Sequence, residues 1–363
     1  MDKKTVRLNP TLLSSWSMEF EHELKSRVIG QARAIRTVSR ALQTWRSGLC
    51  SYEKPIASFL LLGPTGAGKT HLVRSVADVL FENPGAVLKI DCAEFQRSHE
   101  ISKLLGSPPG YVGSDRKPRI TNERLKLYHT EETKISLVLF DEIEKASGAL
   151  WELLLGVLDE GTLTLGDGNF VDFTETMIFF TSNLASREMS ELTGGGIGFH
   201  PGIKEDGVEL DKKIYKTAKT AASHHFSPEF MNRLDRVIVF HSLLPSHMEK
   251  ILDIELKKVQ ERIIFQAPIE KNFIIHYTDA ARNFLLSEGT DAKYGARQLK
   301  RVIERHIVVP ISNLMDTDQV TMGDVVTVDC NEAGELEFTN EVGGALIESK
   351  SPSQPYLLME NEE

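Results

Sequence analysis

The sequence predicts an α/β domain built on a five-stranded parallel sheet, followed by a smaller, mainly α-helical C-terminal domain. Two observations support this fold class. Between residues 28 and 240, five short apolar runs bounded by turn residues alternate with helical patterns, as in a sheet covered by crossover helices. After Pro245 the apolar residues recur instead at spacings of three and four, which is the period of an amphipathic helix.

Each predicted strand is apolar along most of its length, as expected of parallel strands that are buried on both faces. The five strands are expected at residues 58–62, 86–90, 135–140, 177–180 and 236–240. In the second domain, one helix is predicted to carry Leu252, Leu256, Val259 and Ile263, and a later one Leu299, Val302, Ile303 and Ile307. A short strand at 324–328 is expected to close this domain.

The chain has 363 residues, and a typical domain of about 150 residues suggests two domains. We expect a lead-in segment at 1–25, the large domain at 26–243, the small domain at 244–330 and a flexible tail at 331–363. The tail is acidic, with eight glutamates and a single lysine, and few of its residues are apolar.

Several classes of protein are disfavoured. No apolar run is long enough to span a bilayer and no secretory leader is evident, so a cytoplasmic protein without membrane contact is expected. Cys50, Cys92 and Cys330 lie far apart, which disfavours a disulfide framework. A net charge of −10 disfavours nucleic-acid binding. The His224-His225 pair has no metal-ligand partner at helical spacing.

One motif predicts phosphate binding. It consists of Gly63, Pro64, Thr65, Gly66, Ala67, Gly68, Lys69 and Thr70, and it fits G-x-x-x-x-G-K-[ST]. It follows a predicted strand and opens a predicted helix, so its backbone N–H groups can turn toward phosphate oxygens at a helix N-terminus. Lys69 is expected to bind the β- and γ-phosphates, and the Thr70 hydroxyl to bind Mg²⁺.

Two further strand ends carry polar groups suited to nucleotide hydrolysis. Asp141 and Glu142 end an apolar strand; Asp141 is expected to hold Mg²⁺ together with Thr70, and Glu142 to act as the general base toward water. Asn183 ends another strand, and its amide can orient that water. The predicted site therefore takes ATP and Mg²⁺.

The order of these motifs, followed by Phe226–Asp235 and Tyr294–Arg301, resembles the AAA+ module of the Clp unfoldases, in particular the second ATPase ring of ClpA, ClpB and ClpC. The resemblance runs from about Val28 to Val328. These relatives usually carry an N-terminal substrate domain and a first ATPase ring, which this sequence lacks, so a stand-alone, single-ring ATPase is expected.

The resemblance implies roles for further residues. Val28 and Ile29 match the segment that lines the adenine pocket. Arg233 matches the arginine finger, which reaches the nucleotide of a neighbouring subunit, and Arg297 matches the second sensor, which contacts the γ-phosphate from the small domain. A guanidinium suits both roles because phosphoryl transfer spreads negative charge over the γ-oxygens.

Two loops complete the resemblance. Gly106–Gly113 contains two prolines and three glycines, which exclude a regular helix or a central strand. It resembles the loop that projects into the ring channel, where Tyr111 and Val112 would grip an extended polypeptide. Ile197-Gly198-Phe199 resembles the loop with which ClpX docks onto the ClpP peptidase, although a loop folded onto its own domain is an alternative.

The resemblance implies a homo-oligomeric ring, hexameric in these relatives, that threads unfolded or tagged proteins through its channel, with a ClpP-like peptidase as a candidate partner. Three alternatives stay open: a disaggregating chaperone without a peptidase, a nucleic-acid remodeller, and a nucleotide-bound scaffold without turnover. The net charge and the Tyr111 loop oppose the second, and Glu142 and Arg233 oppose the third.

Overall fold

The computed structural model describes residues 9, 11–106, 118–192, 207–291 and 295–344. The chain divides into two compact units, Met1–Ser242 and Leu243–Glu363, and each is described by itself. The division falls at the place where the apolar pattern changes from strands and helices to helices alone.

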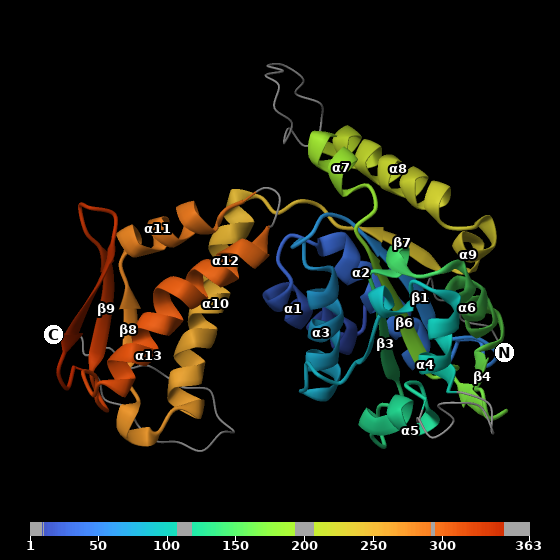
Figure 1. The fold of residues 1–363 in the computed structure, drawn as a ribbon, viewed down its shortest axis with the longest axis horizontal. Helices are drawn as coiled ribbons and strands as arrows, with labels where there is room; N and C mark the ends of the chain where they lie inside the picture. The colour runs from blue at the N-terminus through green and yellow to red at the C-terminus, as the bar shows by residue number, and fades with distance from the viewer. Residues whose placement is uncertain (1–8, 10, 107–117, 193–206, 292–294, 345–363) are drawn as a thin grey trace, which may run out of the picture. The chain divides into compact units, whose positions relative to one another are not determined.

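The first unit is built on the predicted parallel sheet, in the order β2-β3-β6-β1-β7 (Figure 1). The strands are β1 (Ala57–Leu62), β2 (Leu88–Asp91), β3 (Ser136–Asp141), β6 (Thr176–Ser182) and β7 (Arg236–Val239). All neighbouring pairs run parallel. The predicted α/β fold class with five parallel strands is therefore confirmed.

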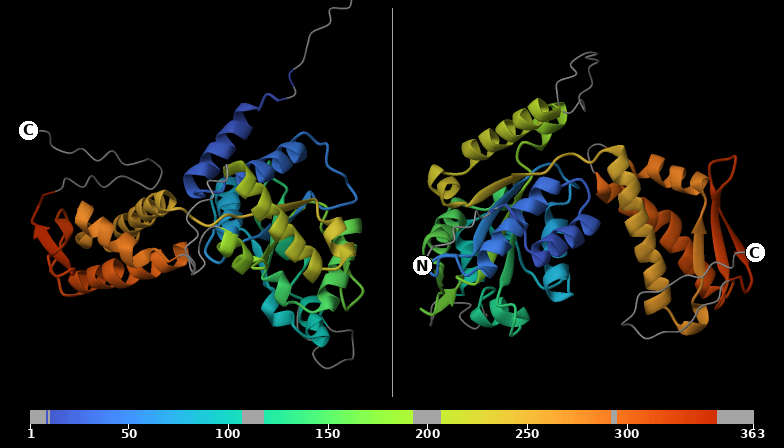
Figure 2. Two further views of the ribbon diagram at one scale, coloured as in Figure 1. Left: turned by 90° about the horizontal axis from the view of Figure 1, so that it is seen from above. Right: turned by 180° about the vertical axis from the view of Figure 1, so that it is seen from behind.

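Alternate residues along the central strands face two separate apolar cores. Phe59 and Leu61 of β1 pack with α1 (Ser15–Arg27), α2 (Ala32–Arg46) and α3 (Lys69–Phe81). Leu60 and Leu62 pack on the opposite face with α6 (Gly148–Glu160), α8 (Gly207–His225) and α9 (Pro228–Arg233). The helices cover both faces of the sheet, as the views in Figure 2 show, and this burial explains why the central strands β1, β3 and β6 are apolar along most of their length.

Shorter elements complete the first unit. They are η1 (Cys92–Phe95), η2 (Ser98–Ile101), α4 (Ser102–Leu105), α5 (Asn122–Leu125), η3 (Lys126–Tyr128), η4 (Ile143–Lys145), the antiparallel pair β4 (Thr162–Thr164) and β5 (Phe170–Asp172), and α7 (Ser186–Leu192). The β4–β5 connection contains Gly166 and Gly168.

The second unit contains the expected helices and a sheet that the sequence predicted only in part. Its helical elements are α10 (Pro245–Gln266), η5 (Ile269–Lys271), α11 (Asp279–Gly289), α12 (Ala296–Ile303), the π-helical turn η6 (Glu304–Val308) and α13 (Val309–Asp316). Its strands β8 (Ile274–Tyr277), β9 (Val325–Cys330) and β10 (Leu336–Glu341) form a sheet in the order β10-β9-β8. Only β9 was predicted.

Two predicted boundaries differ from the structure. The lead-in segment 1–25 contains most of α1, whose Phe20 and Leu24 are buried in the core that also holds α3. The tail predicted from 331 begins with β10, which pairs antiparallel with β9 from Leu336 to Glu341. Both elements were missed because each is mostly polar and buries only a few side chains.

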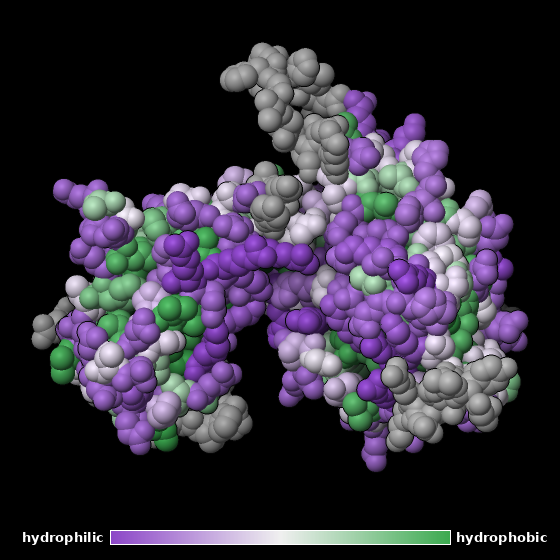
Figure 3. Space-filling view, in the orientation of Figure 1, coloured by the Kyte–Doolittle hydropathy of each residue, from purple (hydrophilic) through white to green (hydrophobic). Residues whose placement is uncertain are grey.

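No helix within the described ranges is long and apolar enough to cross a membrane. On the face seen in Figure 3, hydrophilic residues cover most of the surface of the first unit, with apolar residues between them.

Candidate functional site

The phosphate-loop motif follows β1 directly and leads into α3, as predicted. Gly63 has a φ of 145°, and a Cβ atom at this position would lie 2.6 Å from the carbonyl oxygen of Phe240. Only glycine therefore fits where the loop leaves the strand. Gly68, with a φ of 99°, is the N-cap of α3, so the first N–H groups of that helix and the positive end of its dipole face the loop.

Gln31 holds the loop against the segment that precedes α2. Its side-chain amide donates to the carbonyl oxygens of Ala67 (3.2 Å) and His241 (3.0 Å) and accepts from the His241 N–H (3.3 Å). Val28 is buried and Ile29 half-buried, on the same segment. Val28 and Ile29 thus lie three and two residues before a side chain that bonds the phosphate loop.

Lys69 joins the loop to the end of β6. Its ammonium donates to the carbonyl oxygens of Gly63 (2.6 Å) and Pro64 (2.9 Å) and to the Asn183 amide oxygen (2.7 Å). Asn183 follows β6, which pairs with both β1 and β3. The structure therefore brings the predicted phosphate-binding lysine and the predicted water-orienting amide into direct contact.

Asp141 lies at the end of β3, within reach of Thr70. The Thr70 hydroxyl donates to Asp141 Oδ1 at 3.3 Å, and Lys89 on β2 pairs with Oδ2 at 2.7 Å. Burial alone would raise the pKa of Asp141, but the hydrogen bonds from Lys89 and Thr181 outweigh it and hold that pKa below its usual range. The carboxylate is ionised at neutral pH.

The Thr70 and Asp141 oxygens fit Mg²⁺, which prefers hard oxygen donors and needs few of them from the protein when phosphates and waters supply the rest. Within the described residues no group of three or more histidine, cysteine, aspartate or glutamate side chains could hold a metal ion. A site of this composition suits a magnesium–nucleotide complex better than a dedicated protein-only metal centre.

Glu142 follows Asp141 in a left-handed backbone conformation, with φ 58° and ψ 49°. Its N–H donates to the Thr181 hydroxyl at 3.0 Å, and its carboxylate pairs with Lys145. The hydrogen bond to Glu142 raises the pKa of Lys145. Among non-glycine residues this backbone conformation is uncommon and often marks a functional site.

Arg233 lies at the other edge of the sheet. It ends α9 and pairs with Asp159 of α6. Two residues later, the Asp235 carboxylate accepts from the N–H (2.7 Å) and hydroxyl (2.9 Å) of Ser58, near the amino end of β1. The phosphate loop begins at the opposite, carboxyl end of that strand, and the five residue steps from Ser58 to Gly63 correspond to about 16 Å at 3.3 Å per residue.

The other predicted site residues are distributed as follows. Arg297 is exposed at the second position of α12, in the second unit. Tyr111 and Val112, and the Ile197-Gly198-Phe199 tip, lie outside the described residues.

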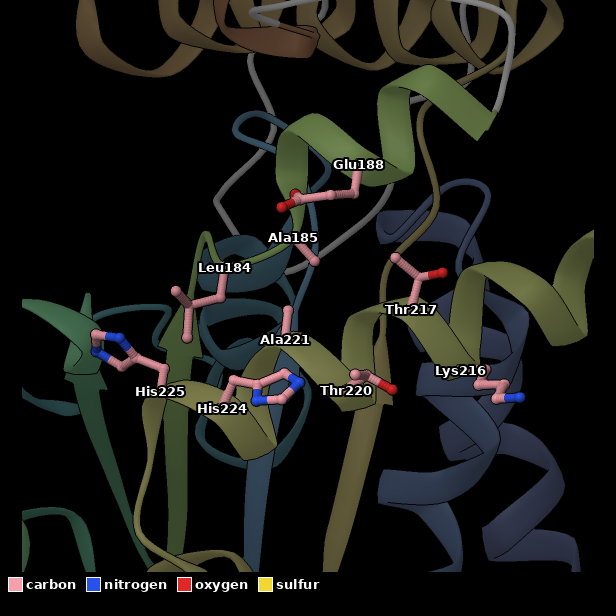
Figure 4. Close-up of a pocket in the computed structure, with 9 residues that line it drawn as sticks. All are labelled: Leu184, Ala185, Glu188, Lys216, Thr217, Thr220, Ala221, His224 and His225. Atoms are coloured by element: carbon pink, nitrogen blue, oxygen red, sulfur yellow. The ribbon is translucent and has the colours of Figure 1, made fainter.

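A groove of about 610 Å³ is lined by residues that start at Leu184, directly after Asn183. Figure 4 shows Leu184 and Ala185 after β6 and Glu188 on α7, with the remaining lining residues on α8. One of them, His225, lies 3.0 Å from the carbonyl oxygen of Glu144 through Nε2, and Glu144 Oε1 accepts from the Asn183 N–H at 3.1 Å. The α8 helix thus contacts the turn after β3, which in turn bonds the end of β6.

The sequence did not predict the parts played by Gln31, Lys89, Thr181 and Glu144. Two of these had a recognisable signal. Lys89 is a charged residue within an otherwise apolar strand, and Thr181 is a polar residue two positions before Asn183, hence on the same face of β6.

Comparisons with known families match both units. Residues 54–237 match the model described as AAA domain (Cdc48 subfamily), and residues 243–328 match the C-terminal, D2-small domain of ClpB protein. The second match begins at the residue at which the second unit begins.

Similar proteins include ClpC of Staphylococcus aureus (strain USA300), an ATP-dependent Clp protease ATP-binding subunit, which is 38% identical over 93% of this chain and 39% of its own length. Chaperone protein ClpB 1 of Thermosynechococcus vestitus is 35% identical over 91% of this chain and 35% of its own length. The chain therefore spans between a third and two fifths of the length of these curated relatives.

Among solved structures, the Saccharomyces cerevisiae Hsp104:casein complex in its extended conformation has a TM-score of 0.72 and 31% identity, covering 90% of this chain and 53% of that one. A closed-state Hsp104 reconstruction with ATPγS and casein has a TM-score of 0.71. The likeness thus extends to the fold of an ATPase that has been observed with a protein substrate.

Proposed function

The chain belongs to the AAA+ ATPases and carries a Clp-type module with its D2-small domain, and on that premise we propose that it unfolds and translocates proteins through the channel of a hexameric ring, driven by ATP hydrolysis. The observation that carries the proposal is that Lys69 contacts Asn183 and Thr70 contacts Asp141 at the carboxyl ends of β6 and β3. The casein-bound Hsp104 structures support a polypeptide substrate.

In this proposal the chain's own groups divide the chemistry between them. The glycine-rich loop and Lys69 bind the phosphates, and Val28 and Ile29 line the base pocket. Thr70 and Asp141 hold Mg²⁺, which neutralises charge on the phosphate oxygens. Glu142 accepts a proton from the attacking water, while the Asn183 amide orients that water.

The position of Arg233 supports a shared active site. This residue ends α9 and pairs with Asp159, and Asp235 two residues later bonds Ser58 near the amino end of β1, so we propose that it meets the nucleotide of a neighbouring subunit. Arg297 is proposed to contact the γ-phosphate from the second unit. Each site would then require two subunits, which couples hydrolysis to ring assembly.

The decisive test of the polypeptide substrate uses the purified chain, ATP and an unstructured protein fused to a compact fluorescent domain. ATP-dependent loss of that domain's fluorescence supports translocation. Unchanged fluorescence with intact ATPase activity opposes it. Tyr111→Ala is expected to abolish unfolding while basal ATPase activity persists, and Tyr111→Phe to be mild, because any aromatic face grips a chain with little sequence preference.

A peptidase partner is a second, separable proposal, and the similarity to both a Clp protease subunit and a ClpB chaperone allows either outcome. We propose that Ile197-Gly198-Phe199 docks a ClpP-like peptidase. Several weak loop contacts on one ring raise the effective concentration and produce stable docking. Deleting the three residues should abolish peptidase-dependent degradation and leave unfolding intact. Failure of the intact chain to bind or stimulate such a peptidase would leave the disaggregating chaperone.

A further inference from the structure

Thr181 lies between the two acidic residues of the site and contacts both. It is the sixth residue of β6 and only 2% exposed. Its hydroxyl donates to Asp141 Oδ1 at 2.5 Å and accepts from the Glu142 N–H at 3.0 Å. A hydroxyl has a single hydrogen, and an ionised carboxylate can only accept, so the direction of both hydrogen bonds is fixed.

The second of these bonds fixes an uncommon backbone conformation. Glu142 has φ 58° and ψ 49°, and its N–H points across to β6. A reciprocal bond runs the other way, from the Asn183 N–H to Glu144 Oε1 at 3.1 Å. These two cross-links tie the turn after β3 to the end of β6, so the residues proposed as base and water-orienting group are held as one unit.

We propose that Thr181 is the positioning residue that holds Glu142 in its left-handed conformation and thereby places the carboxylate for proton abstraction. The inference rests on the proposed role of Glu142 as the base. Thr181 does not itself touch the reacting atoms. Without its hydroxyl, the Glu142 N–H loses its acceptor and the backbone relaxes toward more populated dihedral angles, which moves the carboxylate. A displacement of about 1 Å in such a group costs on the order of 100-fold in rate.

The test compares three substitutions in the full chain. Thr181→Val keeps the shape of the side chain and removes the hydroxyl, whereas Thr181→Ser keeps the hydroxyl. Thr176→Val is the matched control, because Thr176 lies on the same strand and is 1% exposed. Its backbone bonds Phe173 and Ile56, and both of these bonds survive the substitution. Each variant is measured for kcat, KM, binding of a fluorescent nucleotide with Mg²⁺, and thermal unfolding.

We expect Thr181→Val to lower kcat by about 10- to 100-fold while nucleotide affinity stays within about three-fold, because the phosphate loop is untouched and Asp141 keeps its contacts with Thr70 and Lys89. Thr181→Ser should recover most of the kcat, and Thr176→Val should hydrolyse ATP as the native chain does. A general loss of structure would lower nucleotide affinity together with kcat, so the binding measurement separates it from the loss of positioning.

Three results would overturn the inference: unchanged kcat in Thr181→Val, an equal loss in Thr176→Val, or no recovery in Thr181→Ser. If Thr181→Val does not fold, Thr181→Ala removes the same hydroxyl without adding an apolar atom, and the same comparison applies. The proposed role of Glu142 is tested separately by Glu142→Gln. If that variant hydrolyses ATP normally, the proposed catalytic site fails; if it is inactive while Thr181→Val is fully active, only the positioning role fails.

Discussion

Glu142 is proposed as the general base, and its replacement by the neutral isostere glutamine is the most direct test at the scale of one residue. Glu142→Gln should leave nucleotide affinity near that of the native chain and lower turnover by about 100-fold or more, because general-base catalysis contributes roughly 10²–10⁴. Lys69→Ala should instead weaken nucleotide binding. Steady-state ATPase assays and fluorescent-nucleotide titrations separate the two effects. Turnover of the Gln variant within a few-fold of native would remove Glu142 from the mechanism.

Gly63→Ala tests how one added Cβ atom changes the stability of the fold. In Gly63→Ala the new Cβ would lie 2.6 Å from the Phe240 carbonyl oxygen and 2.8 Å from its Cβ, at a φ of 145°. We expect a loss of about 2–3 kcal/mol in the free energy of unfolding, measured by denaturant titration. Gly156→Ala is the control: it lies exposed within α6 with no atom near the added Cβ, and it should gain roughly 0.5–1 kcal/mol. Equal effects of both changes would contradict the close approach at Gly63.

At the scale of elements, Glu255 joins two helices of the second unit. It lies on α10 and pairs with Lys258 on the same helix (2.9 Å) and with Lys300 on α12 (3.1 Å). Burial alone would raise the pKa of Glu255, but the bonds from Lys258 and Lys300 hold it below its ordinary value of 4.5. The stabilisation is therefore complete above pH 4.5 and declines as the pH falls below it.

We expect Glu255→Gln to lose on the order of 1 kcal/mol near neutral pH and to lose less than that as the pH falls below the ordinary glutamate range. Unfolding of the full chain followed across that range measures the difference. Glu261→Gln serves as the control, because Glu261 is half exposed on the same helix and contacts only Lys257 at 4.0 Å. A constant difference at all pH values would show that the ion pairs do not account for the effect of Glu255→Gln.

The elements differ in how well the sequence predicted them. The central strands β1, β3 and β6 were predictable because both of their faces are buried, which requires continuous apolar runs. β10 was not, because an edge strand with one neighbour needs few apolar residues, and only Leu336 and Phe338 pack against the core of the second unit. α1 was not predicted for a similar reason, since few of its side chains are buried.

In the site, the positions of the phosphate-loop motif and of the Asp141-Glu142 pair were predictable from their spacing along the sequence. The supporting groups were not, because Gln31 and Thr181 act through hydrogen bonds to segments far away in the chain. Gln31 reaches His241, and Thr181 reaches Glu142. A single sequence carries no sign of such pairings until the strand order is known.

At the scale of the whole molecule, the proposed role of Arg233 at the nucleotide of a neighbouring subunit predicts cooperation between subunits. Arg233→Ala should lower turnover by about 100-fold or more, and Glu142→Gln should do the same for a different reason. Mixed in equal amounts, the two inactive variants should regain activity, because about a quarter of the interfaces in randomly mixed rings then join an intact Glu142 to an intact Arg233. ATPase assays of the mixture measure this directly.

Dilution of the native chain provides an independent check. If each site needs two subunits, specific activity should fall as the rings dissociate. An inactive mixture, together with specific activity that stays constant through ring dissociation, would place a complete site within one chain.

The strand order also bears on how the chain folds as it is synthesised. β1 carries the phosphate loop and β3 carries Asp141, yet the two strands are not neighbours, since β6 lies between them. A ribosome completes β1 well before it reaches Thr176, and at about 5–20 residues per second that interval is on the order of ten seconds. During that time an apolar strand that ends up fully buried has neither of its eventual partners, β6 and β7. The emerging first unit therefore passes through an aggregation-prone stage, and its nucleotide site can be completed only after the middle strand is inserted.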